Sequence, residues 1–118
     1  MNVDYPHMSI QKQGDAIVIR FDEAMVFDED NAADIRQAVT ELVADQAGIN
    51  LVLDLGNMTD AESRFFGSLI VMMKRVRAQQ GQLRLAAMTE NVHEAFCIAA
   101  LHKTFTICES VEEAIDSF

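Results

Sequence analysis

The chain has 118 residues, the usual length of one domain, and half of them are hydrophobic, which excludes a disordered protein. Its 19 acidic and 9 basic residues give a net charge of −10, which argues against nucleic-acid binding through a basic patch. The acidity either attracts a partner with a basic surface or serves solubility alone.

The apolar runs all fall short of the ~20 residues that span a bilayer. The first residues lack the charged-then-apolar order of a signal peptide. We therefore expect a cytoplasmic protein without membrane insertion.

Residues 8–12 and 16–21 read as two strands joined by a turn at Gly14, which predicts a β-hairpin. The acids of residues 28–31 then favour a helix start, and Ile35, Val39 and Leu42 follow at helical spacing until Gly48 ends the helix.

Residues 49–55 form an apolar run with little alternation, as expected for a strand buried on both faces. A second helix is predicted from about Thr59 or Ser63 to Gln80, with Gly81 as its stop. Its predicted core face is made by the following residues: Phe66, Leu69, Ile70, Met73 and Val76.

Residues 83–88 and 104–108 are the next predicted strands. Thr89 is expected to cap a third helix, and the box from Ser110 to Glu113 to open a fourth. The order β-β-α-β-α-β-α-β-α predicts a mixed sheet, in which function tends to lie at the carboxyl ends of the strands, such as the turn after Leu55.

Neither a cofactor nor a metal is predicted. Cys97 and Cys108 are too few for a disulfide framework, and their apolar neighbours suggest buried thiols. His93 and Cys97 share a helix face and could in principle ligate zinc with His102 and Cys108, but no CxxC or HxxxH pair supports such a site. A phosphate-binding loop, a Ser-His-Asp order and paired catalytic acids are also missing, so we do not expect an enzyme.

The element order together with residues 51–67 resembles the STAS domain, the fold of anti-sigma factor antagonists. The family carries Asp-Ser-Ser-Gly-Leu-Gly at a helix start, and residues 62–67 of this chain read Glu-Ser-Arg-Phe-Phe-Gly. Ser63 falls on the phosphoacceptor serine of regulated members. Glu62 replaces the family's Asp, while Arg64 and Phe65 replace the second Ser and the Gly. Of the family's Gly-Glu-Leu-Asp segment, Asp28 is what remains.

The resemblance implies an α/β fold, with a STAS-like mixed sheet of four to five strands and about four helices in a single domain. It implies a regulatory protein that binds an anti-sigma factor or serine kinase and is released by phosphorylation of Ser63. The candidate interface residues are Asp28, Thr59, Asp60, Glu62, Arg64 and Phe65.

Several alternatives stay open. Thr59 and Glu62 form a Thr-x-x-Glu capping box, which would make Ser63 an ordinary first-turn residue. Phe65 is either an interface anchor or packed under a loop. Asp54 in its apolar strand resembles the phosphoacceptor of a receiver domain, although the initial hairpin disagrees with that fold. The domain would otherwise be a scaffold that is not phosphorylated: a homodimer, or a soluble subunit of a signalling or transporter complex.

Overall fold

A computed structural model describes residues 7–62 and 66–118. Its main sheet has five strands in the order β1-β2-β4-β6-β7, and a separate ribbon pairs β3 with β5. The strands are β1 (Met8–Gln13), β2 (Ala16–Phe21), β3 (Met25–Phe27), β4 (Asn50–Asp54), β5 (Met58–Ala61), β6 (Gln82–Ala86) and β7 (Thr106–Cys108). The helices are α1 (Glu29–Asp45), α2 (Phe66–Ala78), α3 (Glu90–Ile98) and α4 (Val111–Asp116).

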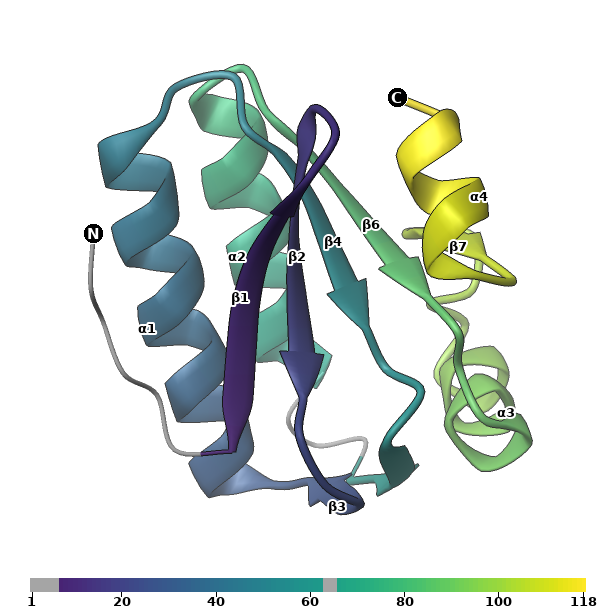
Figure 1. Cartoon of the computed structure of the whole chain (residues 1–118). Helices are drawn as coiled ribbons and strands as arrows, with labels where there is room; N and C mark the ends of the chain where they lie inside the picture. Colours follow the sequence, from purple (N-terminus) through teal and green to yellow (C-terminus); the bar gives the residue numbers. More distant parts are fainter. Residues whose placement is uncertain (1–6, 63–65) are drawn as a thin grey trace.

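The predicted mixed sheet is confirmed. β1 runs antiparallel to β2, while β2, β4, β6 and β7 are parallel neighbours. Helices α1 and α2 cover one face of the sheet, and α4 covers part of the other (Figure 1). The carboxyl ends of β2, β4 and β6 all point to the lower edge of the molecule in Figure 1, where α1 begins.

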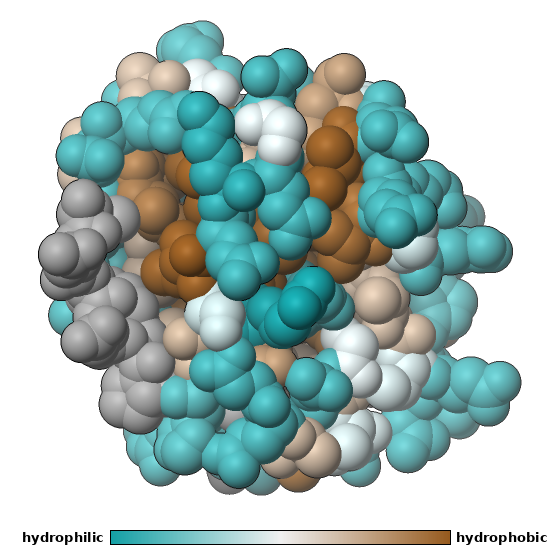
Figure 2. All heavy atoms as spheres, in the orientation of Figure 1, coloured by the Kyte–Doolittle hydropathy of each residue, from teal (hydrophilic) through white to brown (hydrophobic). Residues whose placement is uncertain are grey.

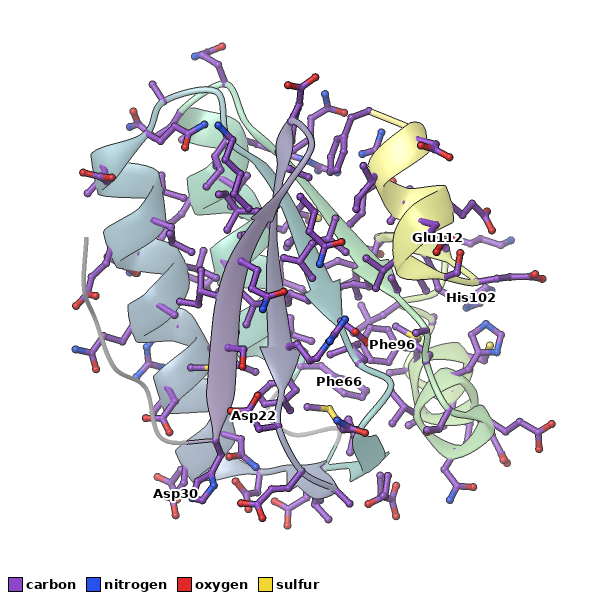
Figure 3. The ribbon with its side chains drawn as sticks, in the orientation of Figure 1. Asp22, Asp30, Phe66, Phe96, His102 and Glu112 are labelled. Carbon is purple, nitrogen blue, oxygen red and sulfur yellow. The ribbon has the colours of Figure 1, made fainter. Side chains whose placement is uncertain are left out.

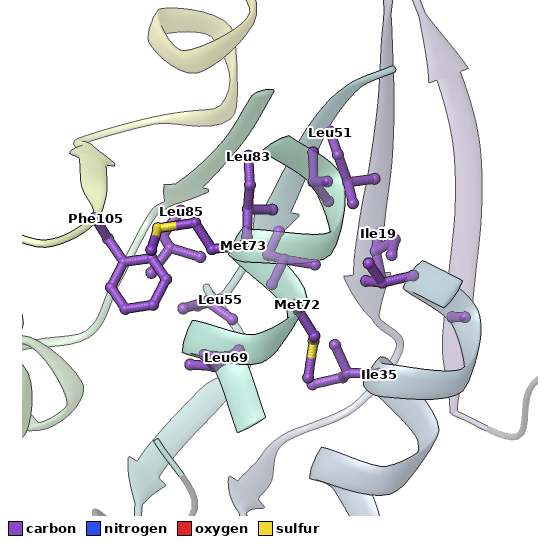
Figure 4. Close-up of a cluster of buried hydrophobic side chains, with 14 of the residues drawn as sticks. Ile19, Ile35, Leu51, Leu55, Leu69, Met72, Met73, Leu83, Leu85 and Phe105 are labelled. Carbon is purple, nitrogen blue, oxygen red and sulfur yellow. The ribbon is translucent and has the colours of Figure 1, made fainter. Parts of the chain in front are cut away.

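Alternating side chains of the central strands divide the core into two layers. Ile19, Leu51 and Leu53 are fully buried in the larger layer under α1 and α2, part of which Figure 4 shows. Val18 and Val52 point to the opposite face, in a smaller cluster that includes residues of α4. Apolar residues on both faces of β4 explain why its sequence alternates so little.

Three predicted helix starts are confirmed by their capping bonds. The Asp28 carboxylate accepts the backbone N–H of Asn31 at 3.0 Å at the start of α1. Thr89 Oγ1 caps α3, and Ser110 Oγ accepts the backbone N–H of Glu113 at 3.1 Å at the start of α4. Each cap satisfies one backbone donor that the helix itself leaves open.

The predicted helix start at Thr59 is wrong, and so is the capping box with Glu62. Thr59 lies in β5, whose backbone pairs with β3 rather than turning into a helix. Pairing with a strand far away in the sequence has overridden a local capping pattern. The described part of the second helix begins at Phe66; Ser63, Arg64 and Phe65 lie outside the described residues.

The predicted core face of α2 is largely confirmed, since Phe66, Leu69, Met73 and Val76 are buried. The buried face is wider than the predicted one, because Met72, which that prediction did not include, is fully buried against the core. Ile70 is only partly buried.

The two thiols differ. Cys108 is buried as predicted, but Cys97 is exposed, so that prediction is wrong. Helix α3 buries only Val92 and Phe96 completely, and Cys97 follows Phe96 on a side that turns away from the core.

Candidate functional site

The ribbon of β3 and β5 builds the lower end of the molecule. β3 follows β2 and β5 follows β4, so both short strands lie beyond the carboxyl ends of the main sheet (Figure 1). They pair in parallel, which places Val26 opposite Asp60 and Phe27 opposite Ala61. The turn after Leu55, where we expected function, leads directly into this ribbon.

Side-chain hydrogen bonds fix the ribbon to the rest of the domain. Asn57 Nδ2 donates to the carbonyl of Phe21, at the end of β2, at 2.5 Å. From the start of α3, Thr89 Oγ1 donates to the carbonyl of Met58 at 3.1 Å. The side chain of Met58 itself is buried, with 2% of the residue exposed. A four-residue strand is thereby held in one position by groups from β2 and α3.

Asp28 joins the same end of the molecule from the other strand of the ribbon. It follows β3 directly and caps α1. Asn31, in the first turn of α1, donates through Nδ2 to the carbonyl of Val26 at 2.5 Å, which ties the helix start to the ribbon. The structure therefore brings together four of the predicted interface residues: Asp28, Thr59, Asp60 and Glu62.

We call this surface the acidic end; it is defined by Asp22, Glu23, Asp28, Glu29, Asp30, Asp60 and Glu62. Figure 3 shows Asp22 and Asp30 at the lower end of the molecule, and Figure 2 shows hydrophilic residues covering the same region. Ser9 donates a hydrogen bond to Asp22, and His7 contacts the Glu23 carboxylate. Val26, 40% exposed, adds an apolar side chain within the acidic end. The surface suits a partner that is basic with a small apolar centre.

Asp54 has a structural part in this end of the sheet. One of its carboxylate oxygens lies 3.1 Å from Arg20 Nε, and the other accepts the backbone N–H of Gly56 at 2.9 Å. These two contacts hold β2 to β4 and shape the turn that leads to β5. The carboxylate is thereby engaged on both oxygens, which differs from the exposed acceptor expected of a receiver domain.

Sequence reasoning missed Asn57 and the donor role of Thr89, which hold the acidic end in place, and the exposed side chain of Val26 within it. Asn57 follows a glycine in a turn, a common position for an asparagine that bonds to backbone. The triplet of β3 is too short to be read as a strand from periodicity.

Two surface hollows lie elsewhere. One of about 340 Å³ lies between α1 and α2, and one of about 700 Å³ is lined by Met88, His93, His102, Phe105, Ile107, Cys108 and Glu109. Within residues 7–62 and 66–118, no three potential metal ligands gather in one place. The helices in that part of the chain are too short or too polar to cross a membrane.

Comparison with known proteins decides the family. The family model of the STAS domain matches residues 7–114. The chain belongs to the STAS domain family. The predicted resemblance to that family is confirmed.

BtrV of Bordetella bronchiseptica, a candidate anti-sigma factor antagonist, is 31% identical over 90 residues, which cover 75% of this chain and 78% of BtrV. An anti-sigma factor antagonist from Mycobacterium paratuberculosis has a TM-score of 0.78 at 19% identity, covering 98% of this chain and 97% of that one.

SpoIIAA, also an anti-sigma factor antagonist, is similar in its unphosphorylated form, with a TM-score of 0.76 at 19% identity over 93% of this chain and 94% of that one. Its phosphorylated form, from Bacillus, has a TM-score of 0.67 at 18% identity over 93% and 97% of the two chains. The structures show that the fold is that of these antagonists.

Proposed function

We propose that this STAS domain is a cytoplasmic anti-sigma factor antagonist that binds an anti-sigma factor or serine kinase through its acidic end. The single observation that carries the proposal is the gathering of Asp28, Thr59, Asp60 and Glu62 at one end of the sheet, next in sequence to Ser63. Family membership supports the class of partner. The role is regulatory binding rather than catalysis.

The charge of this end supports the choice of partner surface. Residues 1–60 hold 12 acids against 3 bases, whereas residues 61–118 hold 7 acids against 6 bases, so the negative field is concentrated in the half that builds the acidic end. Such a field speeds the approach of a basic partner and disfavours an acidic one. The effect weakens with salt, because exposed charges are screened beyond ~8 Å at physiological ionic strength.

Phosphorylation of Ser63 is proposed as the release signal. A phosphate adds about −1.5 to −2 charges and three acceptor oxygens. Ser63 directly follows Glu62, so the added charge joins an end that is already strongly acidic. Inside a packed interface, the phosphate is bulky and loses part of its hydration, so it disrupts the contact unless a cation is placed to pair with it. Arg64 is the nearest such cation in the sequence.

The test is incubation with the cognate serine kinase and ATP, followed by mass spectrometry and a binding measurement. The proposal expects one added phosphate on the wild type, none on Ser63→Ala, and loss of the complex only for the phosphorylated protein. Phosphate on Ser63→Ala, or a phosphorylated protein that keeps its partner, would contradict the switch.

A second function, a scaffold that binds without phosphorylation, is favoured by the departures at Arg64 and Phe65 from the family pattern. A permanent partner, such as a second copy of the chain or a complex subunit, replaces the regulated kinase in this case. Ser63→Ala and wild type would then bind equally under all conditions, and Phe65→Asp would abolish binding. A Phe65→Asp variant that retains every partner would exclude this residue from the interface.

A further inference from the structure

Helix α2 is basic, although the chain as a whole is strongly acidic. Its 13 residues include Lys74, Arg75 and Arg77 and no acid, in a chain with 19 acids and a net charge of −10. All three cations are exposed. Among the described residues, none of the three pairs with a carboxylate, since the ion pairs there involve other cations. Their positive charge is therefore offered to the surroundings of the protein.

One flank of α1 extends this basic surface. Arg75 Nη1 donates to Thr40 Oγ1 at 2.8 Å, and exposed Arg36 lies one turn before Thr40 on α1. The acids in the C-terminal half of α1 are Glu41 and Asp45. They lie about 100–140° around that helix from Thr40, so they point away from α2. The positive charges of the two helices thus lie side by side without an intervening acid.

We call the surface formed by Arg36, Val71, Lys74 and Arg75 the basic face. Val71 is 43% exposed and lies one turn before Arg75, so the basic face includes an apolar side chain. The hollow of about 340 Å³ between α1 and α2 adjoins Arg75 and is lined partly by alanines. The basic face therefore suits an acidic surface with a small apolar centre.

The acidic end of the same chain has this composition. It contains seven acids together with Val26, which is 40% exposed. Helix α2 runs away from the acidic end in Figure 1, and its cations lie in its last two turns, so the two surfaces cannot meet within one copy. We propose that the acidic end of one copy of this chain binds the basic face of a second copy.

The net charges of two copies do not prevent this contact at physiological salt. The chain measures 33 × 28 × 24 Å, so the centres of two touching copies lie about 30 Å apart, almost four screening lengths of ~8 Å. Screening over that distance removes almost all of the repulsion between the net charges. Opposite charges in contact lie within one screening length, so they keep much of their attraction.

The contact joins two different surfaces of the chain. Made twice about a two-fold axis, it gives a closed dimer, and made once per copy it gives a ring or an open chain. Both arrangements bury the same two surfaces, so the same variants test either one. The contact needs no other protein, so its test is separate from that of the proposed function.

Sedimentation equilibrium of the full chain, kept reduced because Cys97 is exposed, measures the association. The salt concentrations are about 10 mM, 150 mM and 1 M, at which charges are screened beyond about 30, 8 and 3 Å. We expect reversible association that is strongest at the middle concentration. The net charges repel at low salt, and the ion pairs of the contact are screened at high salt. A monomer at all three concentrations, or association that is strongest at either extreme, would overturn the proposal.

Charge-reversal variants assign the two surfaces. Lys74→Glu and Asp60→Lys each replace an attractive charge by a repulsive one, so each alone is expected to weaken association by about 10-fold. An equimolar mixture of the two should associate again, because the intact acidic end of one variant meets the intact basic face of the other. Lys103→Glu and Asp116→Lys make the same charge changes at exposed positions outside both surfaces, and they should stay within about twofold of wild type.

Circular dichroism checks that each variant folds, which is expected because Lys74 and Asp60 are exposed. Undiminished association of Lys74→Glu would exclude the basic face, and undiminished association of Asp60→Lys would exclude the acidic end. Equal losses in the control variants, or a mixture that associates no better than its two components, would also overturn the proposal.

Discussion

Thr89 links the fold to the acidic end, and replacing it with valine tests that link. Valine has nearly the same shape but lacks the hydroxyl. Thr89 Oγ1 accepts the backbone N–H of Val92 at 3.4 Å and donates to the carbonyl of Met58 at 3.1 Å. The first bond caps α3, and the second holds β5 against it. One substitution therefore removes both.

The cost follows from the two bonds. The capping bond is long, so its loss is expected at the lower end of the range for caps, about 0.5 kcal/mol. The bond to Met58 is partly buried, and the loss of a partner there costs about 1–1.5 kcal/mol. Together, Thr89→Val is expected to reduce the free energy of unfolding by about 1.5–2 kcal/mol. With an unfolding entropy of about 0.25 kcal/mol/K for this length, Tm falls by about 6–8 °C.

Differential scanning calorimetry and urea unfolding measure the loss, and Thr89→Ser is the control because serine keeps the hydroxyl. We expect Thr89→Ser to lie much closer to wild type than Thr89→Val does. Partner binding should weaken in Thr89→Val, since β5 carries Thr59 and Asp60. If Thr89→Val is as stable as wild type, the hydroxyl does not hold β5 in place, and the account of the acidic end is wrong.

Other substitutions test packing and helix capping elsewhere in the domain. Gly81→Ala places a Cβ 2.6 Å from the backbone oxygen of Ile49, so we expect it to lower the free energy of unfolding in urea by about 1–3 kcal/mol. Gly67→Ala, in open space on α2, should raise that free energy by about 0.5–1 kcal/mol. Equal effects of the two variants would contradict the close approach at Gly81. Phe66→Ala removes a buried ring whose centre lies 4.4 Å from that of Phe96, with the two ring planes tilted by 45°. An expected loss of about 3–5 kcal/mol would appear in the same assay, and a loss of less than about 1 kcal/mol would rule out this contact. Asp28→Ala should lower stability by about 1 kcal/mol through the lost cap of α1, and Asp28→Asn should restore most of it; an equal loss in both would assign the effect to charge instead.

The main sheet was predictable from sequence because its signals are local. Apolar runs marked the strands, and Asp28, Thr89 and Ser110 marked helix starts that the structure confirms. These residues act within one turn of their own position, so their chemistry shows in a short window of sequence.

The ribbon was not predictable in the same way. β3 and β5 have three and four residues, too few to show a period, and each is stable only because the other lies beside it. Their partners come from more than 30 positions away in the chain. The pattern Thr59-x-x-Glu62 pointed to a helix start, and only the tertiary pairing shows why it is a strand.

The exposure of Cys97 could have been predicted. Val92 and Phe96 lie four residues apart and define the buried face of α3, and the next residue lies about 100° around the helix from Phe96. Apolar neighbours in sequence suggested burial, but helical geometry decides which of them face the core. Met72 on α2 was missing from the predicted core face, which was too narrow. Helix α2 also packs against α1, so it buries a wider face that includes Met72.

The most direct test of the central claim, that the acidic end binds the partner, is isothermal titration of the cognate anti-sigma factor or serine kinase with Asp60→Lys. Asp116→Lys makes the same change of charge at the exposed end of α4 and serves as the control. We expect Asp60→Lys to weaken binding by at least about 10-fold, or 1.4 kcal/mol, while Asp116→Lys binds within about twofold of wild type. Equal affinities for wild type and Asp60→Lys, or equal losses in the two variants, would contradict the claim.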